Sequence, residues 1–180
     1  SLKSSYVGEL NYQDFTFVDG VYVSSVLIDG QSAYCGLTFR NKRLVEVCIK
    51  QETEGFKGVQ TERFDYEIME IILPTEGSEG GEEFSQEVTE EEFYLAVVFD
   101  GVDRVRRIAD TFMRYGDVDI ANHNEVHYDG NKIYDSYNNN YYEITDDGVY
   151  FYTCDPELGW VKNTANDGEY PSLMSIASLF

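Results

Sequence analysis

The sequence predicts an α+β fold that is predominantly antiparallel β. Two stretches, 6–73 and 125–162, are rich in aromatic and β-branched residues and are interrupted by Asp-Gly and Asn-rich turns, as in antiparallel meanders. Between them, residues 92–121 predict a β-α-β unit. The chain has 180 residues, of which 42% are hydrophobic and 15% aromatic. This is enough apolar material for a core that needs neither disulfides nor a metal.

The N-terminal stretch predicts five or six antiparallel strands, arranged as a meander or a small barrel. Asp19-Gly20 joins the first two strands and is the strongest short hairpin signal, and a second Asp-Gly at 29–30 ends the next strand. Polar segments 40–43 and 51–58 separate the later strands. The predicted strands are residues 15–18, 21–28, 33–39, 44–49 and 63–73.

The balance of charge changes near residue 74. Residues 1–73 contain seven Lys or Arg and eleven Asp or Glu, whereas residues 74–180 contain six and twenty-three. The segment 74–81 holds one proline and three glycines, which is typical of a mobile loop or linker. We therefore expect a β-rich N-terminal subdomain at 1–73, an acidic Gly/Glu loop or linker at 74–91, and an acidic α+β subdomain at 92–180.

The β-α-β unit is predicted from three consecutive patterns. Residues 92–100 have the aromatic and β-branched content of a strand, and residues 102–115 have apolar positions spaced by three and four, as in a helix with one buried stripe. Gly116 would end that helix, and another strand would begin at Val118. At the C-terminus, residues 171–180 predict a short helix that packs on the core, with Pro171 in its first turn.

Composition narrows the class of partner. A net charge of −21 opposes binding to nucleic acid or to an anionic membrane, so we expect a basic protein partner. The three cysteines are widely spaced and predict reduced thiols, neither a disulfide framework nor a zinc cluster. No apolar run approaches the roughly 18 residues that span a bilayer, and no signal sequence is visible. We expect a cytoplasmic location, unless a leader was removed before Ser1, and no cofactor.

The candidate partner-binding surface is the second meander. Carboxylates spread over strands and tight turns are held in fixed positions, and tyrosines between them offer aromatic area for anchoring. An acidic surface that only maintains solubility is the alternative interpretation. The candidate residues are Asp117, Asp119, Glu125, Asp129, Asp135, Glu143, Asp146, Asp147, Tyr134, Tyr137 and Tyr141.

Both histidines lie in one short segment, 117–129. If this segment is extended, His123, Glu125 and His127 share one face and could hold a divalent metal such as zinc. The spacing differs from the zinc-protease His-Glu-x-x-His helix, so that motif is rejected. A solvated strand face and a pH-responsive contact are the other interpretations.

Four of the six basic residues in the acidic half occur between 104 and 114. We expect them to pair with nearby carboxylates and so neutralise part of the charge; a local anion site is the alternative. No phosphate loop, nucleophile elbow or kinase motif accompanies them. The four residues are Arg104, Arg106, Arg107 and Arg114.

The charge balance over residues 74–160 resembles that of the nucleic-acid-mimicking inhibitors carried by phages and mobile elements, the anti-restriction and anti-CRISPR proteins. The resemblance is compositional and includes no residue motif. It implies a stoichiometric inhibitor whose carboxylates replace phosphates at the basic groove of a nucleic-acid-handling protein. The alternatives are the immunity protein of a toxin pair, a metal-dependent enzyme using His123, Glu125 and His127, and a structural or adaptor domain.

Overall fold

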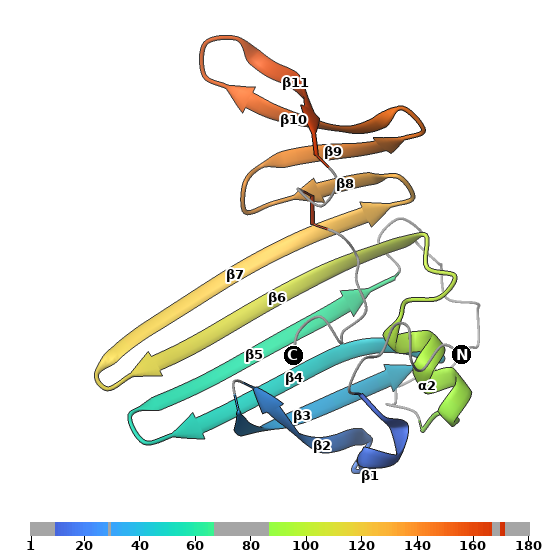
Figure 1. Ribbon diagram of the computed structural model, residues 1–180, viewed down its shortest axis with the longest axis vertical. Coiled ribbons are helices and arrows are strands. Elements are labelled where there is room, and N and C mark those ends of the chain that lie inside the picture. Colours follow the sequence, from blue (N-terminus) through green and yellow to red (C-terminus); the bar gives the residue numbers. More distant parts are fainter. Residues whose placement is uncertain (1–9, 29, 67–86, 167–169, 172–180) are drawn as a thin grey trace, which may run out of the picture.

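The computed structural model describes residues 10–28, 30–66, 87–166 and 170–171. Its strands form one antiparallel sheet in which each strand pairs with the next along the chain (Figure 1). One α-helix, α2, and a 3-10 turn, η1, accompany the sheet in the described residues. The elements are η1 (Tyr12–Asp14), β1 (Thr16–Val18), β2 (Val21–Ile28), β3 (Gln31–Arg40), β4 (Arg43–Thr53), β5 (Phe56–Asp65), α2 (Glu90–Val97), β6 (Arg104–Tyr115), β7 (Val118–Asp129), β8 (Lys132–Asp135), β9 (Asn140–Thr145), β10 (Gly148–Asp155) and β11 (Gly159–Ala165).

The predicted N-terminal meander is confirmed, with a longer hairpin than expected. Asp19-Gly20 and Asn41-Lys42 are two-residue turns with positive φ at both positions, which suits the twist of paired strands. The polar segment 51–58 was expected to separate strands, but it belongs to β4 and β5, which are joined by a turn at Glu54-Gly55. The small-barrel alternative is wrong, because the described strands form an open sheet with β1 and β11 at its edges.

The predicted β-α-β unit is wrong, and its strand and helix are exchanged. Residues 92–100, expected as a strand, contain most of helix α2. The helix begins at a capping box, in which the Glu92 amide donates to the Thr89 hydroxyl at 3.2 Å and the Thr89 amide donates to the Glu92 carboxylate at 3.0 Å. Three glutamates in its first turn also favour the positive end of the helix dipole.

The predicted helix at 102–115 is instead the strand β6. It pairs along its length with β5 on one side and β7 on the other, which satisfies the backbone groups of a central strand. Val105 is fully buried on one face, while Arg104 and Arg106 lie on the other. Gly116 is a hairpin turn residue with φ 58 and ends no helix. The fold is therefore nearly all antiparallel sheet and not the predicted α+β class. The helix expected at 171–180 lies outside the described residues, apart from Pro171.

Strands β5 and β6 pair directly, so the strands before and after the predicted linker belong to one sheet. Of the predicted linker at 74–91, residues 74–86 lie outside the described residues. Val88, close to its end, is buried in the core. The division into two subdomains stays a prediction.

Helix α2 and η1 pack on one face of β2 to β4, here called the covered face (Figure 1). Phe93 of α2 is 0% exposed, and its ring centroid lies 5.4 Å from that of Phe39 and 5.8 Å from that of Tyr22. The Tyr22 hydroxyl both donates to the Val88 carbonyl and accepts from its amide, which fixes the entry to α2. Burial raises the pKa of Tyr22 to about 12. The covered face is marked by Tyr22, Leu37, Val47, Glu62, Arg107, Val126, Ile133 and Tyr142.

Candidate functional site

The opposite side of the sheet, here called the open face, carries a continuous row of side chains from β6 to β11. Each residue of the row stands directly opposite the next in the strand register, so neighbouring Cβ atoms lie about 4.5–5.5 Å apart. The row begins and ends with a cation and is aromatic between them. Its members, in order, are Arg106, His127, Tyr134, Tyr141, Tyr152 and Lys162.

Three aromatic side chains of this row, His127, Tyr134 and Tyr141, contact one another in series, and Tyr141 also contacts Trp160 of β11. The ring centroids of Tyr134 and Tyr141 are 4.7 Å apart, and those of Tyr141 and Trp160 are 5.4 Å apart in an edge-on arrangement. Tyr141 is 47% exposed and Trp160 53% exposed, although both rings are large and apolar. The strand order thus gathers aromatic residues far apart in sequence into one surface patch.

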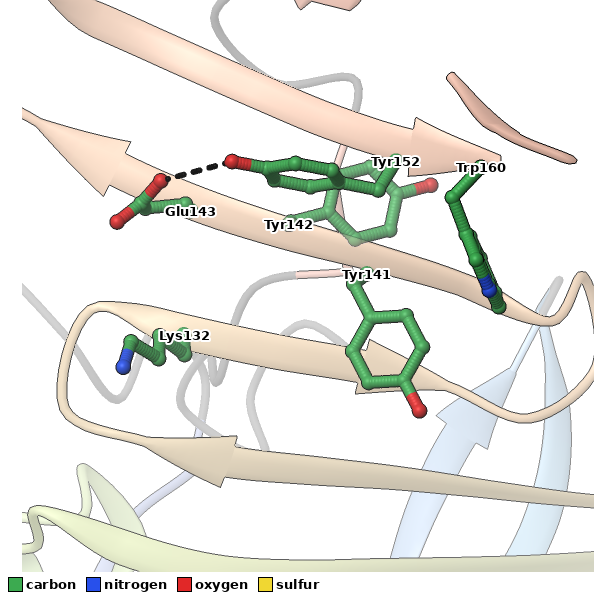
Figure 2. A pocket seen from close by; sticks show the side chains of 6 residues that line it. All are labelled: Lys132, Tyr141, Tyr142, Glu143, Tyr152 and Trp160. Atoms are coloured by element: carbon green, nitrogen blue, oxygen red, sulfur yellow. Dashed lines mark hydrogen bonds between the residues drawn. The ribbon is translucent and has the colours of Figure 1, made fainter. Parts of the chain in front are cut away.

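An open pocket of about 330 Å³ lies within this patch (Figure 2). Tyr141, Tyr152 and Trp160 provide its aromatic part, while Lys132 and Glu143 stand near its other end. Tyr142 also borders the pocket, although it is a buried residue of the covered face. We call these six residues the aromatic pocket.

Two cations and one carboxylate control the charge of the aromatic pocket. The Tyr152 hydroxyl donates to the Glu143 carboxylate at 3.2 Å, and Lys132 stands opposite Glu143 in the register. The Lys162 ammonium lies 4.1 Å from the ring centroid of Tyr150 and 5.5 Å from that of Tyr152. Its hydrogen bond with Tyr152, helped by the nearby Glu143 carboxylate, raises the pKa of Lys162.

Several of the predicted partner-binding carboxylates are engaged inside the protein. Asp119 pairs with Arg114 at 2.6 Å and Asp129 pairs with Arg104 at 2.8 Å. Asp135 is buried and accepts hydrogen bonds from the turn that follows it, including the Tyr137 amide at 3.0 Å. These side chains stabilise the sheet and its turns, so they offer less free charge than the sequence suggests.

Apart from Glu125, which lies in β7, the other predicted residues divide between the aromatic pocket and the turns. Tyr141 and Glu143 line the pocket, and Tyr134 stands beside Tyr141 in the row. The remainder, Asp117, Tyr137, Asp146 and Asp147, are exposed and lie in turns between strands. Sequence reasoning missed Trp160, Tyr152 and both lysines, because only the register of β8 to β11 brings them to Tyr141 and Glu143.

The histidine segment is the strand β7, and its alternation of faces is confirmed. His123 Nδ1 lies 2.6 Å from an Asp110 oxygen, and the Glu125 carboxylate lies 3.4 Å from a ring nitrogen of both His123 and His127. The hydrogen bond with Asp110 is the main cause of the raised pKa of His123. Burial opposes ionisation of Glu125, but hydrogen bonds from His127 and His123 outweigh it and lower its pKa.

A metal site gains no support from this arrangement. Within the described ranges, no group of three or more His, Cys, Asp or Glu side chains is placed to hold a metal ion. Instead, Asp110 of β6 pairs with His123 of β7, and Glu125 pairs with His127 within β7. The side chains on this face of β7 are hydrogen-bonded to one another and to β6, and the contact between His123 and Asp110 depends on the protonation of His123.

The expectation that the arginines of residues 104–114 neutralise carboxylates is confirmed, on a strand in place of a helix. Arg106 pairs with Asp65 across β5 and β6 at 2.9 Å. Arg107 pairs with Glu62 at 3.1 Å, and Glu62 is only 2% exposed. With the Arg104 and Arg114 pairs described above, all four arginines hold a carboxylate of a neighbouring strand.

Comparisons with protein-family models, curated proteins and solved structures gave no match.

In the part of the chain that the structure describes, no helix has the length and apolar character needed to cross a membrane. Cys35, Cys48 and Cys154 are free thiols, and burial raises the pKa of Cys35 to about 12. The aromatic pocket is therefore the candidate site on the strength of its own geometry.

Proposed function

We propose that this protein is an acidic, stoichiometric inhibitor that binds a basic, nucleic-acid-handling protein in the cytoplasm. The observation that carries the proposal is the exposed aromatic pocket on the open face of an anionic sheet. Tyrosine and tryptophan are the residues that most often anchor protein interfaces, because their rings bury a large area at little cost in conformational entropy. A side chain such as Trp160 gains little from exposure in a protein that acts alone.

The net negative charge of the chain also supports binding to a basic partner. A net charge of −21 raises the rate at which a basic protein meets this chain and disfavours acidic competitors. Asp117, Asp146 and Asp147 are exposed at the ends of the strands, where they can steer an approaching cationic surface. Because Asp119 and Asp129 are already paired, aromatic anchoring carries more of the proposed contact than a continuous imitation of phosphates.

Aromatic anchoring combined with acidic steering would also serve an immunity protein that blocks a basic toxin. The two functions differ in what the partner does, and the surface is the same. The identity and activity of the captured partner therefore separate them. Free cysteines are compatible with the reducing cytoplasm that both functions would require.

The proposal is tested by affinity capture with a matched pair of variants. The chain is immobilised, exposed to lysate of a candidate host at low salt, and compared with a Tyr141→Ser/Trp160→Ser double variant. Tyr34→Ser, which removes an exposed ring from the open face of β3, is the control. We expect the wild type and the control to retain a basic nucleic-acid-binding protein, and the double variant to lose it.

The captured protein is then purified and assayed for nucleic-acid binding or cleavage. We expect one equivalent of the chain to suppress that activity, and high salt to release the complex, since exposed charges are screened. Recovery of no basic protein at low salt would overturn the proposal. Equal retention by the double variant would show that the aromatic pocket is not the contact surface.

A further inference from the structure

The aromatic pocket presents ring faces that can hold a cation, beside one carboxylate and two lysines. Ring faces attract a cation within about 6 Å of the ring centroid, and tryptophan does so most strongly. Trp160 and Tyr141 are exposed and meet edge-on, so their ring faces point in different directions. Within the described residues, no cationic side chain lies over either of these two rings.

Glu143 provides the carboxylate that a cation needs beside the rings. Its Oε2 accepts the hydroxyl of Tyr152, which fixes the orientation of the group. Among the described residues this is the only hydrogen bond of the Glu143 side chain, so Oε1 can accept from an N–H donor outside the protein. Figure 2 shows Glu143 and Lys132 at one end of the pocket and Trp160 at the other, with the Tyr152 hydroxyl pointing to Glu143.

The same face already holds an ammonium group on aromatic rings close to the pocket. Lys162 lies 4.1 Å from the ring centroid of Tyr150 and 5.5 Å from that of Tyr152, within the range of a cation–π contact. Tyr152 therefore has a cation on the side of Lys162 and borders the pocket on the side of Tyr141. The sheet thus provides an internal example of the contact that the open rings can make.

From these contacts we propose that the aromatic pocket receives the guanidinium group of an arginine presented by the partner. The guanidinium plane would stack on the Tyr141 ring, with Trp160 bordering it edge-on, and Glu143 would accept its N–H donors. Arginine fits better than lysine because its planar group combines stacking with paired hydrogen bonds. The identification of the arginine as the partner's rests on the proposed function, whereas the cation chemistry rests on the pocket itself.

Lys132 provides a test of whether the ligand of the pocket is positively or negatively charged. Its ammonium borders the pocket, so it opposes an incoming cation and would favour an incoming anion. Replacing Lys132 with glutamine therefore strengthens binding if the ligand is cationic and weakens it if the ligand is anionic. Glu143→Gln has the opposite effect in both cases, and the two variants keep the shape of the pocket nearly unchanged.

The experiment uses Trp160 as its own reporter, because it is the only tryptophan in the chain. The full chain is titrated with N-acetyl-arginine amide and with the corresponding citrulline compound, which is neutral and nearly the same shape. We expect a saturable change in Trp160 emission with the arginine compound and a much weaker one with citrulline. Glu143→Gln should raise the dissociation constant about two- to fivefold, the size of one exposed cation contact, and Lys132→Gln should lower it.

Two results would overturn the inference. An equal response to citrulline would mean that the pocket accepts neutral ligands, and weaker binding by Lys132→Gln would mean that it prefers anions. The citrulline comparison uses the wild type alone, so this part of the test does not depend on the folding of a variant.

The outcomes also separate this inference from the proposed function. If a basic protein is captured but the arginine compound does not change Trp160 emission, the proposed function is supported and the arginine pocket is rejected. A specific arginine response without any basic partner would keep the pocket and reject the function.

Discussion

The two ends of the sheet use aromatic residues in different ways. Over β2 to β4, helix α2 covers the sheet, and Phe93, which has no exposed surface, contacts the rings of five other aromatic residues. Over β8 to β11, the open face leaves Tyr141 and Trp160 about half exposed. The hairpins are similar in both regions, but the buried rings lie on the covered face and the exposed rings on the open face, so the face of the sheet separates core from candidate contact surface.

The largest expected effect concerns the covered region. Phe93→Ala should destabilise the protein by about 3–5 kcal/mol, because it removes a buried ring and leaves a cavity among Tyr22, Phe39 and Phe15. Trp160→Ala, on the open face, should cost less than about 1 kcal/mol. Urea unfolding followed by circular dichroism measures both, and similar losses would contradict the contrast between the two regions.

A second comparison sets a buried ion pair against an exposed one on the same strand. Arg107→Ala should cost about 3 kcal/mol, near the lower end for buried pairs, because it leaves the Glu62 carboxylate buried without its cation. Arg104→Ala, which breaks the exposed pair with Asp129, should cost about 0–1 kcal/mol. The same unfolding assay applies, and an equal cost would show that the burial of Glu62 contributes nothing to the pair.

The capping box tests whether α2 is stabilised locally. Thr89→Ala removes the hydroxyl that accepts from the Glu92 amide and should cost about 1 kcal/mol. Thr164→Ala, at an exposed position of β11, should change stability by less than about 0.5 kcal/mol. If both substitutions had the same effect in urea unfolding, the helix would not depend on its cap.

The smallest effect is expected at His123, which is exposed. Since its pKa is raised in the folded state by Asp110, its contribution to stability is complete below the unfolded value of about 6.5. That contribution is lost as the pH rises through the higher folded pKa. An NMR titration should therefore give a pKa above about 6.5 for His123, and Asp110→Asn should lower it. An unchanged pKa in this variant would contradict the contact.

Local turn chemistry explains which parts of the fold could be predicted. Asp19-Gly20 between two apolar runs specifies a hairpin without help from distant residues, and β7 alternates faces as its sequence indicates. The exchange of strand and helix at residues 92–115 has a different cause. The apolar spacing of β6 suits a helix, but pairing with both β5 and β7 overrides it. The Thr89 to Glu92 capping box was a visible helix signal that pointed to α2.

The candidate site was only partly predictable for the same reason. Tyr141 and Glu143 were predicted as partner-binding residues from their residue types and from the acidic, tyrosine-rich stretch around them, which are local properties of the sequence. Trp160 and Lys132 reach them through the register of four strands, and no single stretch of sequence shows that register. Likewise, the pairing of Asp119 and Asp129 with arginines became visible only once β6 was known to be a strand.

This acidic chain is proposed to bind a basic partner through its aromatic pocket. The decisive quantity is the dissociation constant of the complex with the captured partner, measured by calorimetry for wild type, Tyr34→Ser and the Tyr141→Ser/Trp160→Ser variant. We predict that the double variant binds at least about tenfold more weakly, equivalent to about 1.4 kcal/mol, while Tyr34→Ser binds like the wild type. Equal affinity of all three proteins would contradict the claim.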